Sequence, residues 1–259
     1  MTETKSQWQT KELATAFLNG VRGAIPGADI QMAVLCKIVH QWFPCPCRLL
    51  DLGCGDGILG RMLLDTFPTV HAVLADFSDP MLDAARGKLG ENPRATVVKA
   101  DFSTPEWLAA VTSRTPFDIV VSGFAIHHQP DDRKRNLYAE IHAVLSPGGV
   151  FLNLEHVASR SKAGEHLFDE IFVDHLHDFH RASDRTKTRQ AIADAYYKRP
   201  DKKENILAPV DSQCQWLRDI GFQDVDCFFK IFELALFGGR KTSNQASEVT
   251  ARKLAEPQG

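Results

Sequence analysis

The sequence lacks long hydrophobic runs and a large excess of charge of either sign. No apolar stretch in its 259 residues approaches the length needed to cross a bilayer, and the N-terminus MTETKSQWQT is polar. We therefore expect neither a signal peptide nor a membrane anchor. Lys and Arg number 30 against 33 Asp and Glu, a net charge of −3, which argues against extensive binding to nucleic-acid phosphates.

Paired metal-ligand cysteines are also missing. The six cysteines are scattered along the chain. The segment Cys45-Pro46-Cys47 resembles half of a metal site, but no second Cys or His pair follows it at ligand spacing. We expect no metal ion, and reduced thiols in a cytoplasmic protein.

What the sequence does contain is a regular alternation of strand-length and helix-length segments, which is typical of an α/β fold with a parallel sheet. Strands are expected at residues 48–52, 70–77, 95–102, 117–125 and 150–157, and helices at 58–67, 79–88 and 133–145. A helix at 214–222 ends at a glycine, and the two apolar stretches within 225–241 are expected to form an antiparallel pair.

Two regions fall outside this alternation and suggest a division of the chain. Residues 1–47 are expected to form an N-terminal helical cap segment, with a break at Ile25-Pro26-Gly27, and residues 160–208 a polar helical insertion that adds to the cap. The core then consists of residues 48–159, completed by a helix and hairpin at 209–240. Residues 241–259 have the composition of a weakly ordered tail.

The stretch LLDLGCGDGILG, residues 49–60, contains two overlapping glycine patterns. The pattern from Gly55 to Gly60 matches the G-x-G-x-x-G fingerprint of dinucleotide-binding turns, whereas DLGCGDG resembles a loop that holds S-adenosylmethionine. Glycines at 53, 55 and 57 allow close backbone approach or positive φ for either cofactor. The glycines alone do not distinguish a dinucleotide from S-adenosylmethionine.

Acidic residues at the ends of the first three expected strands favour the second pattern. Asp76 can accept hydrogen bonds from both ribose hydroxyls, and Asp101 can accept one from an adenine amino group while Phe102 covers the ring. Asp51, before the glycines, can face an ammonium group or fix the loop, but it would repel a pyrophosphate. The alternatives are that Asp76 caps the following turn and that Asp101 is an exposed loop acid.

The segments DLGCGDG, ADFSDPML, KADF, FDIVVSGFAIHH and LSPGGVFLN, in this order, resemble class I S-adenosylmethionine-dependent methyltransferases. The resemblance implies a Rossmann-like, seven-stranded, mostly parallel sheet with helices on both faces and the last strand inserted antiparallel. Cys54 lies in the loop because a small side chain fits there, and we expect no nucleophilic role for it. The cofactor contacts expected on this basis are Asp51, Gly53, Cys54, Gly55, Asp76, Phe77, Met81, Asp101, Phe102 and Ser122.

Residues after the fourth expected strand bear on the methyl acceptor. The chain has Ser122-Gly-Phe-Ala where methyltransferases of DNA bases carry an Asp/Asn-Pro-Pro-aromatic loop. Metal-dependent catechol-type enzymes place acidic ligands around this loop and the next. Asp131 and Asp132 lie several residues beyond the loop and are interpreted as caps of the next helix. His127-His128 resembles the small-molecule methyltransferases, including those of quinone biosynthesis, and we expect a small-molecule acceptor.

Four residues are candidates for catalysis. His127 or His128 is a potential general base, the alternative being one packed and one solvated histidine. Glu155 ends the fifth expected strand and is a candidate substrate contact. His175 shares a predicted apolar helix stripe with Phe168, Ile171, Phe172, Leu176 and Phe179, where it either lines a substrate pocket or is a core histidine.

Other functions remain open at this point. A carboxy-S-adenosylmethionine synthase or another enzyme of transfer-RNA wobble modification is one, although Trp216 occupies the position where the synthases have an arginine, with Arg218 two residues on. An NAD-dependent oxidoreductase is disfavoured because no Tyr-x-x-x-Lys catalytic pair follows the fourth expected strand. Tyr138 has His142 at the position of the lysine. A non-catalytic sensor of the cofactor is a further alternative, and a homodimer is left open.

Overall fold

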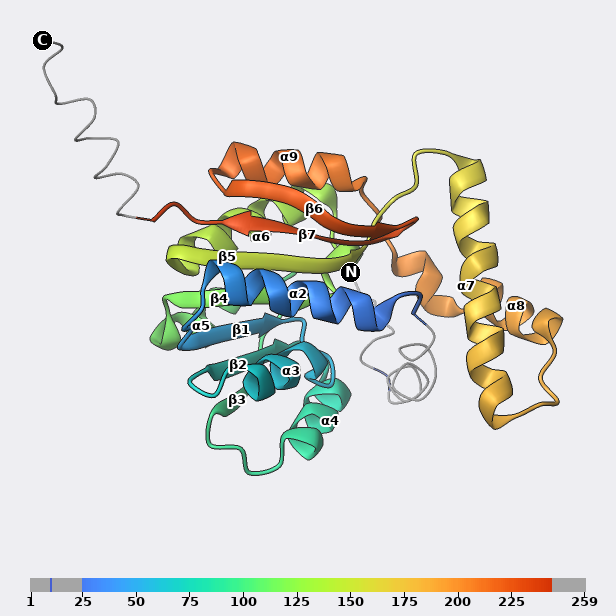
Figure 1. The fold of residues 1–259 in the computed structure, drawn as a ribbon, viewed down its shortest axis with the longest axis horizontal. Helices are drawn as coiled ribbons and strands as arrows, with labels where there is room; N and C mark the ends of the chain where they lie inside the picture. The colour runs from blue at the N-terminus through green and yellow to red at the C-terminus, as the bar shows by residue number, and fades with distance from the viewer. Residues whose placement is uncertain (1–9, 11–24, 244–259) are drawn as a thin grey trace, which may run out of the picture.

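The computed structural model describes residue 10 and residues 25–243. Within them, seven strands form one sheet in the order β3-β2-β1-β4-β5-β7-β6 (Figure 1). Strands β1 to β5 run parallel to one another, and β7 lies antiparallel between β5 and β6. The predicted Rossmann-like α/β sheet with an inserted antiparallel last strand is confirmed. The strands are β1 (Arg48–Leu52), β2 (His71–Asp76), β3 (Ala95–Lys99), β4 (Phe117–Gly123), β5 (Leu145–His156), β6 (Gln223–Ile231) and β7 (Leu234–Arg240).

Helices cover both faces of the sheet, as the apolar character of the central strands requires. One buried cluster packs α2, α3 and α4 against one face, and a second packs α5, α6 and α9 against the other (Figure 1). Short 3₁₀ turns η4 (Thr112–Arg114) and η5 (Ile126–His128) flank β4. The helices are α2 (Ala28–Trp42), α3 (Ile58–Thr66), α4 (Asp79–Leu89), α5 (Trp107–Val111), α6 (Asp131–Val144) and α9 (Val210–Ile220).

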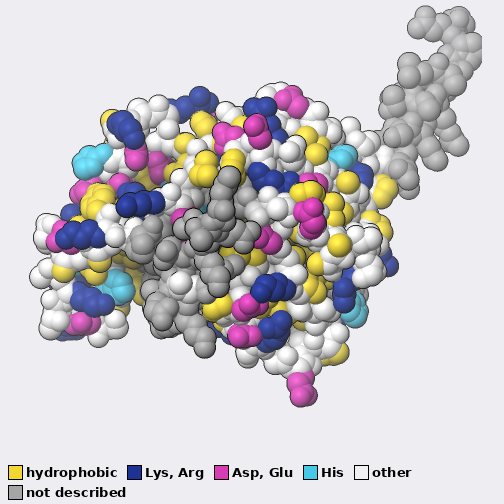
Figure 2. All heavy atoms as spheres, turned by 180° about the vertical axis from the view of Figure 1, so that it is seen from behind, with side chains coloured by type: hydrophobic (Ala, Val, Ile, Leu, Met, Phe, Trp, Pro, Cys, Tyr) yellow, Lys and Arg dark blue, Asp and Glu magenta, His cyan; other side chains and the backbone are white. Residues whose placement is uncertain are grey.

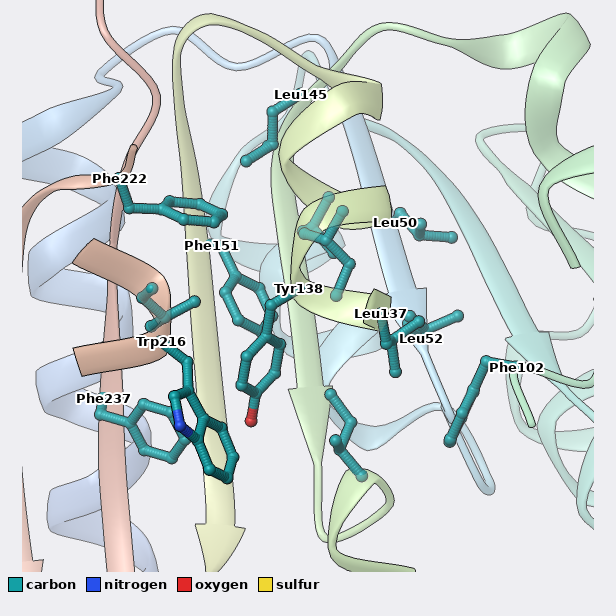
Figure 3. Close-up of a cluster of buried hydrophobic side chains, with 14 of the residues drawn as sticks. Leu50, Leu52, Phe102, Leu137, Tyr138, Leu145, Phe151, Trp216, Phe222 and Phe237 are labelled. Carbon is teal, nitrogen blue, oxygen red and sulfur yellow. The ribbon is translucent and has the colours of Figure 1, made fainter. Parts of the chain in front are cut away.

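Large aromatic side chains fill the space between the sheet and the α6–α9 pair (Figure 3). The Tyr138 ring lies 5.5 Å from the Phe151 ring, and its hydroxyl donates to Gln213 Oε1 at 2.6 Å. This hydrogen bond satisfies a polar group that would otherwise be costly to bury. It also links α6 to α9 beneath the carboxyl half of the sheet.

The insertion forms a small helical layer beyond the end of β5 (Figure 1). It consists of α7 (Lys162–Ser183), α8 (Arg189–Lys198) and the 3₁₀ turn η6 (Pro200–Glu204). Ser161 and Thr188 cap α7 and α8 through hydrogen bonds from Gly164 N and Ala191 N. Its own apolar cluster, which includes Phe168, Phe172, Leu176, Ile192 and Tyr196, reaches Leu234 at the start of β7. The insertion is therefore packed on the hairpin.

The structure corrects two expectations about element ends. Strand β5 begins at Leu145 instead of residue 150, because Leu145 pairs with Phe117 of β4 and the Gly149 carbonyl accepts from Lys241 N at 2.8 Å. Helix α6 begins at Asp131 after Pro130, so Asp131 and Asp132 lie in its first turn and do not cap it through their side chains. Asp131 instead pairs with Lys134.

The predicted helical segment before residue 25 and the tail after residue 243 lie outside the described residues. Within the residues that the structure describes, no helix has the length and apolar character that crossing a membrane requires. Lys and Arg are interspersed with Asp and Glu over the face seen from behind (Figure 2). This mixture agrees with the small net charge.

Candidate active site

The glycine loop joins β1 to α3 at the carboxyl edge of the sheet. Gly53, Gly55 and Gly57 have φ values of 70°, 55° and 78°, a region that favours glycine. A Cβ on Gly53 would lie 2.4 Å from Ala125 Cβ, and one on Gly57 would lie 2.5 Å from Leu74 Cδ2. The positive φ favours glycine at both positions, and at Gly53 the close Ala125 Cβ excludes any side chain as well.

Asp51 fixes this loop from beneath. Its buried carboxylate accepts a hydrogen bond from Gly60 N at 2.8 Å, close to the N-terminus of α3. This hydrogen bond joins β1 to the first turn of α3. Burial, together with the charges of Asp51, Asp76 and Asp56, raises the pKa of the Cys54 thiol well above its ordinary value, so that thiol stays protonated and is a poor nucleophile.

Asp76 lies at the tip of β2 and also contacts the loop. Its two carboxylate oxygens accept hydrogen bonds from Gly55 N and Ser78 N, each at 2.8 Å. Burial raises its pKa, and these hydrogen bonds oppose the shift. Each carboxylate oxygen has a further lone pair, so the contact to the loop leaves capacity for a ligand hydroxyl.

The remaining predicted cofactor residues differ in how they are placed. Asp101 is exposed and accepts from Ser103 N at 2.8 Å, whereas the Phe102 ring is buried against Gly53. Met81 is buried and Phe77, next to Asp76, is half-buried. Ser122 is fully buried and donates to Leu52 O at 2.7 Å, so its hydroxyl links β4 to β1.

A second polar group is built around His127, in the turn after β4, and Glu155, near the end of β5. His127 Nδ1 lies 2.6 Å from Glu155 Oε1, and the His127 amide donates to Glu155 Oε2 at 3.0 Å. The His127 ring centroid is 3.9 Å from that of His128 and 5.7 Å from that of His156. The structure thus brings together three of the four predicted catalytic residues.

Burial dominates the electrostatics of this cluster. It raises the pKa of Glu155 to about 7, while it lowers the pKa of His127 well below its ordinary value and that of His128 to about 4. The charges of His156 and Lys134 lower the pKa of His127 further. Near neutral pH, His127 is therefore in its neutral form, and Glu155 lies close to its own pKa.

His175, the fourth predicted catalytic residue, is exposed on α7. The expectation that it shares the apolar stripe is wrong, because the buried side chains of α7 are Phe168, Asp169, Phe172, Val173 and Leu176. The helix turns Val173 toward the hydrophobic cluster and leaves His175 and Phe179 outside it.

Two buried charged residues next to this cluster were not expected from the sequence. Glu233, between β6 and β7, lies 2.9 Å from His156 Nε2 and accepts from Ser159 N at 3.2 Å. Lys134 on α6 has no exposed surface and donates to Asp131 and to the carbonyl of Ile206. No local pattern signals the contact of His156 with Glu233, 77 positions away, or that of Lys134 with Ile206, 72 positions away.

The end of the insertion closes over the two histidines. Ile206 N donates to His127 O at 2.9 Å, and His128 Nδ1 lies 3.2 Å from Glu204 O. The His127 ring makes a further hydrogen bond with the Asn205 side chain. The segment after η6 therefore covers the histidine turn and connects the insertion to it.

In the described part of the chain, no group of three or more His, Cys, Asp or Glu side chains is arranged to hold a metal ion. The carboxyl edge of the sheet suits a different ligand. A glycine loop, the buried carboxylate of Asp76 and the Asp101–Phe102 pair offer acceptors and an aromatic surface on three adjacent strands. These groups fit hydroxyls, an amino group and a cationic ligand better than a pyrophosphate.

Comparison with known proteins agrees with this chemistry. Residues 49–149 match the model of a methyltransferase domain. The carboxy-S-adenosyl-L-methionine synthase of Chromohalobacter salexigens is 25% identical over 238 residues, covering 87% of this chain and 80% of that protein. The trans-aconitate 2-methyltransferase of Variovorax paradoxus is 36% identical over 103 residues, covering 40% of this chain and 36% of that protein.

Among solved structures, an O-methyltransferase family protein from Burkholderia thailandensis matches with a TM-score of 0.57 at 15% identity. The match covers 94% of this chain and 66% of that protein, slightly less than two thirds of its length. At this identity the likeness concerns the fold. Residues 49–149 thus match a methyltransferase domain, and the chain is similar over most of its length to carboxy-S-adenosyl-L-methionine synthases.

Proposed function

We propose that this enzyme transfers the sulfonium methyl group of S-adenosylmethionine to a nucleophilic atom of a small molecule by in-line displacement. The observation that carries the proposal is the buried His127–Glu155 pair, 2.6 Å between Nδ1 and Oε1. It lies at the same carboxyl edge of the sheet as the glycine loop. A proton-accepting pair next to the cofactor loop suits an acceptor that must lose a proton.

The strand tips hold the cofactor in this proposal. Asp76 accepts from the ribose hydroxyls, and Asp101 accepts from the adenine amino group. The glycine loop and Asp51 face the amino-acid end. The adenine ring lies among Phe77, Met81 and Phe102, while Cys54 and Ser122 shape the wall without chemistry of their own.

The bound cofactor supplies a methyl group that is already activated by its positive sulfur, so the protein mainly has to orient the acceptor. His127, neutral because burial lowers its pKa, accepts the proton that the acceptor hydroxyl or amine loses. Glu155 holds the ring through Nδ1 and stabilises the resulting charge. The acceptor gains the methyl group, and the released proton stays on the pair until it exchanges with water.

The helical regions complete the proposal. Residues 160–208 act as a cap that excludes water and selects the acceptor, around a core of 48–159 and 209–240. Helix α2, which the sequence assigned to an N-terminal cap segment 1–47, instead covers one face of the sheet. The six cysteines form no disulfide, which supports a reducing compartment such as the cytoplasm.

Label transfer tests the proposed reaction. The full chain is incubated with methyl-labelled S-adenosylmethionine and a cell extract separated into small-molecule and macromolecular fractions. We expect enzyme-dependent label in the small-molecule fraction, and we expect a His127→Ala variant to lose most of it. Label that enters only nucleic acid or protein would contradict the small-molecule proposal.

A second candidate follows from the similarity to carboxy-S-adenosyl-L-methionine synthases, which extends over 87% of the chain. In that case the cofactor itself would be modified. Trp216, at the position expected for the synthase arginine, is buried in the aromatic cluster, with the Arg135 guanidinium 4.7 Å from its ring centre. Mass spectrometry of the cofactor pool distinguishes the two, because methyl transfer yields S-adenosylhomocysteine and the synthase reaction yields a carboxylated sulfonium.

A further inference from the structure

The turn after β3, which contains Asp101 and Phe102, is fixed by an arginine from another element. Arg133, in the first turn of α6, donates through Nε to Phe102 O at 2.8 Å and through a terminal nitrogen to Thr104 O at 3.2 Å. A planar guanidinium that binds two carbonyls of one turn restrains both its position and its orientation. The turn therefore depends on α6 for its conformation.

Arg133 is itself rigidly held. Its two terminal nitrogens donate to the two carboxylate oxygens of Glu140, each at 2.7 Å. The side chains of Arg133 and Glu140 are only 12% and 16% exposed, and Trp107 Nε1 donates to the same carboxylate at 2.6 Å. Such a bidentate pair, shielded from water, is strong and geometrically specific.

The restrained turn also touches the glycine loop. The Phe102 ring lies 3.1 Å from the point where a Cβ of Gly53 would be. Asp101, the preceding residue, is held through its carboxylate by Ser103 N. A shift of the Phe102 carbonyl would thus move both the ring and the carboxylate that face the adenine end of the cofactor.

We infer that Arg133, held by Glu140 and Trp107, is a positioning residue that sets the affinity and the base selectivity for the adenine end of S-adenosylmethionine. The inference rests on the proposed roles of Asp101 and Phe102. It assigns no contact between Arg133 and the cofactor. Its effect passes through the backbone of the turn.

The test compares two cofactor analogues on two arginine variants. S-adenosylhomocysteine and S-inosylhomocysteine differ in the amino group that Asp101 is proposed to bind. Arg133→Met removes the donors to the turn. Arg94→Met is the matched control, because Arg94 also donates to backbone carbonyls, those of Leu64, Phe67, Pro68 and Val70, but at the opposite end of the strand.

Calorimetric titration of the full chain gives the affinities, and thermal unfolding reports stability. The wild type should prefer S-adenosylhomocysteine. Arg133→Met should bind it about tenfold more weakly and lose most of the preference, since a charge-assisted hydrogen bond is lost. Arg94→Met should unfold at a lower temperature but keep the preference. Glu140→Gln, which leaves Arg133 in place, should change the preference in the same direction by less.

The outcomes distinguish the positioning role of Arg133 from the proposed adenine role of Asp101. If the wild type discriminates and both Arg133→Met and Glu140→Gln retain that discrimination, the positioning role is overturned while the cofactor site stands. If the wild type binds both analogues equally, the adenine role of Asp101 is wrong, and the inference falls with it. If Arg94→Met loses the preference as much as Arg133→Met, the effect reflects general stability, which also overturns the inference.

Discussion

The cofactor end and the acceptor end of the site lie at the same edge of the sheet but are built differently. At the cofactor end, Asp76 and Gly55 are joined across 21 positions, within one strand–helix–strand unit. At the acceptor end, contacts such as His128 with Glu204 and His156 with Glu233 join residues 76 and 77 positions apart. One half of the site is local in sequence, and the other is assembled by the insertion and the hairpin.

This difference indicates which part of the molecule can change the specificity for the acceptor. The glycine loop is constrained by its own backbone and by its neighbours on β2 and after β4, so few substitutions are tolerated there. The histidine cluster depends on a long segment that packs on the sheet from outside. A change in that segment can alter the acceptor without disturbing the cofactor loop.

The largest effect is expected for Gly53→Ala. The alanine would need a φ of 70° and would place its Cβ 2.4 Å from Ala125 Cβ. We expect a loss of about 2–5 kcal/mol in the free energy of unfolding and no measurable cofactor binding. Gly221→Ala is the control, because Gly221 has φ 110° with nothing within 4 Å of its Cβ. It should cost about 1–2 kcal/mol in urea unfolding. Equal losses would contradict the packing argument.

Asp76→Ala should act mainly on the cofactor. Removing a buried carboxylate that accepts charge-assisted hydrogen bonds should weaken S-adenosylmethionine binding at least about tenfold in calorimetry. Asp79→Ala is the matched control, since this nearby exposed carboxylate pairs with the exposed Lys99 and should change affinity little. Unchanged affinity in Asp76→Ala would refute the ribose role.

The pH dependence of stability in Glu155→Gln tests the acceptor end of the site. Because the folded-state pKa of Glu155 is raised from 4.5 to about 7, the native protein binds a proton more tightly than the unfolded chain does. That stabilising contribution is present below pH 4.5 and is lost as the pH rises through 7. Wild type should therefore gain about 2–3 kcal/mol relative to Glu155→Gln between pH 7.5 and pH 4.5.

His127 contributes with the opposite sign, because its lowered pKa removes stability as the pH falls below 6.5. The two contributions oppose each other in the wild type, and only that of His127 remains in Glu155→Gln. Urea unfolding at several pH values measures the difference. A difference that does not change with pH would show that Glu155 titrates normally.

The smallest effect is expected for His175→Ala. The side chain is exposed and outside the buried face of α7, so the free energy of unfolding should change by less than about 0.5 kcal/mol and methyl transfer should be unchanged. A large loss of transfer would restore the catalytic role that the sequence predicted.

The sequence was most informative where a structural feature is local. The strand that ends in Asp51, the glycine turn and the acid at Asp76 share one unit, and residue spacing alone brings them together. The helical stripe of α7 was misassigned because Val173 and His175 are both near its edge. Which of them packs depends on Ile192 and Tyr196 of α8, and the sequence does not specify the crossing of two helices.

Residues that act through distant contacts gave no local signal. Lys134 is fully buried and bound to the carbonyl of Ile206, 72 positions away. Glu233 follows a strand of the hairpin and meets His156 only after β7 inserts beside β5. Their roles follow from the topology, which a pattern of neighbouring residues cannot reveal.

Glu155→Gln gives the most direct test of the claim that the cofactor end and the acceptor end of the site act separately. Its affinity for S-adenosylhomocysteine is measured by calorimetry, and its rate of methyl transfer is measured by label entering the small-molecule fraction. We predict an unchanged affinity and a slower transfer. A variant that loses affinity for S-adenosylhomocysteine but transfers methyl at the wild-type rate when saturated with cofactor would contradict the account.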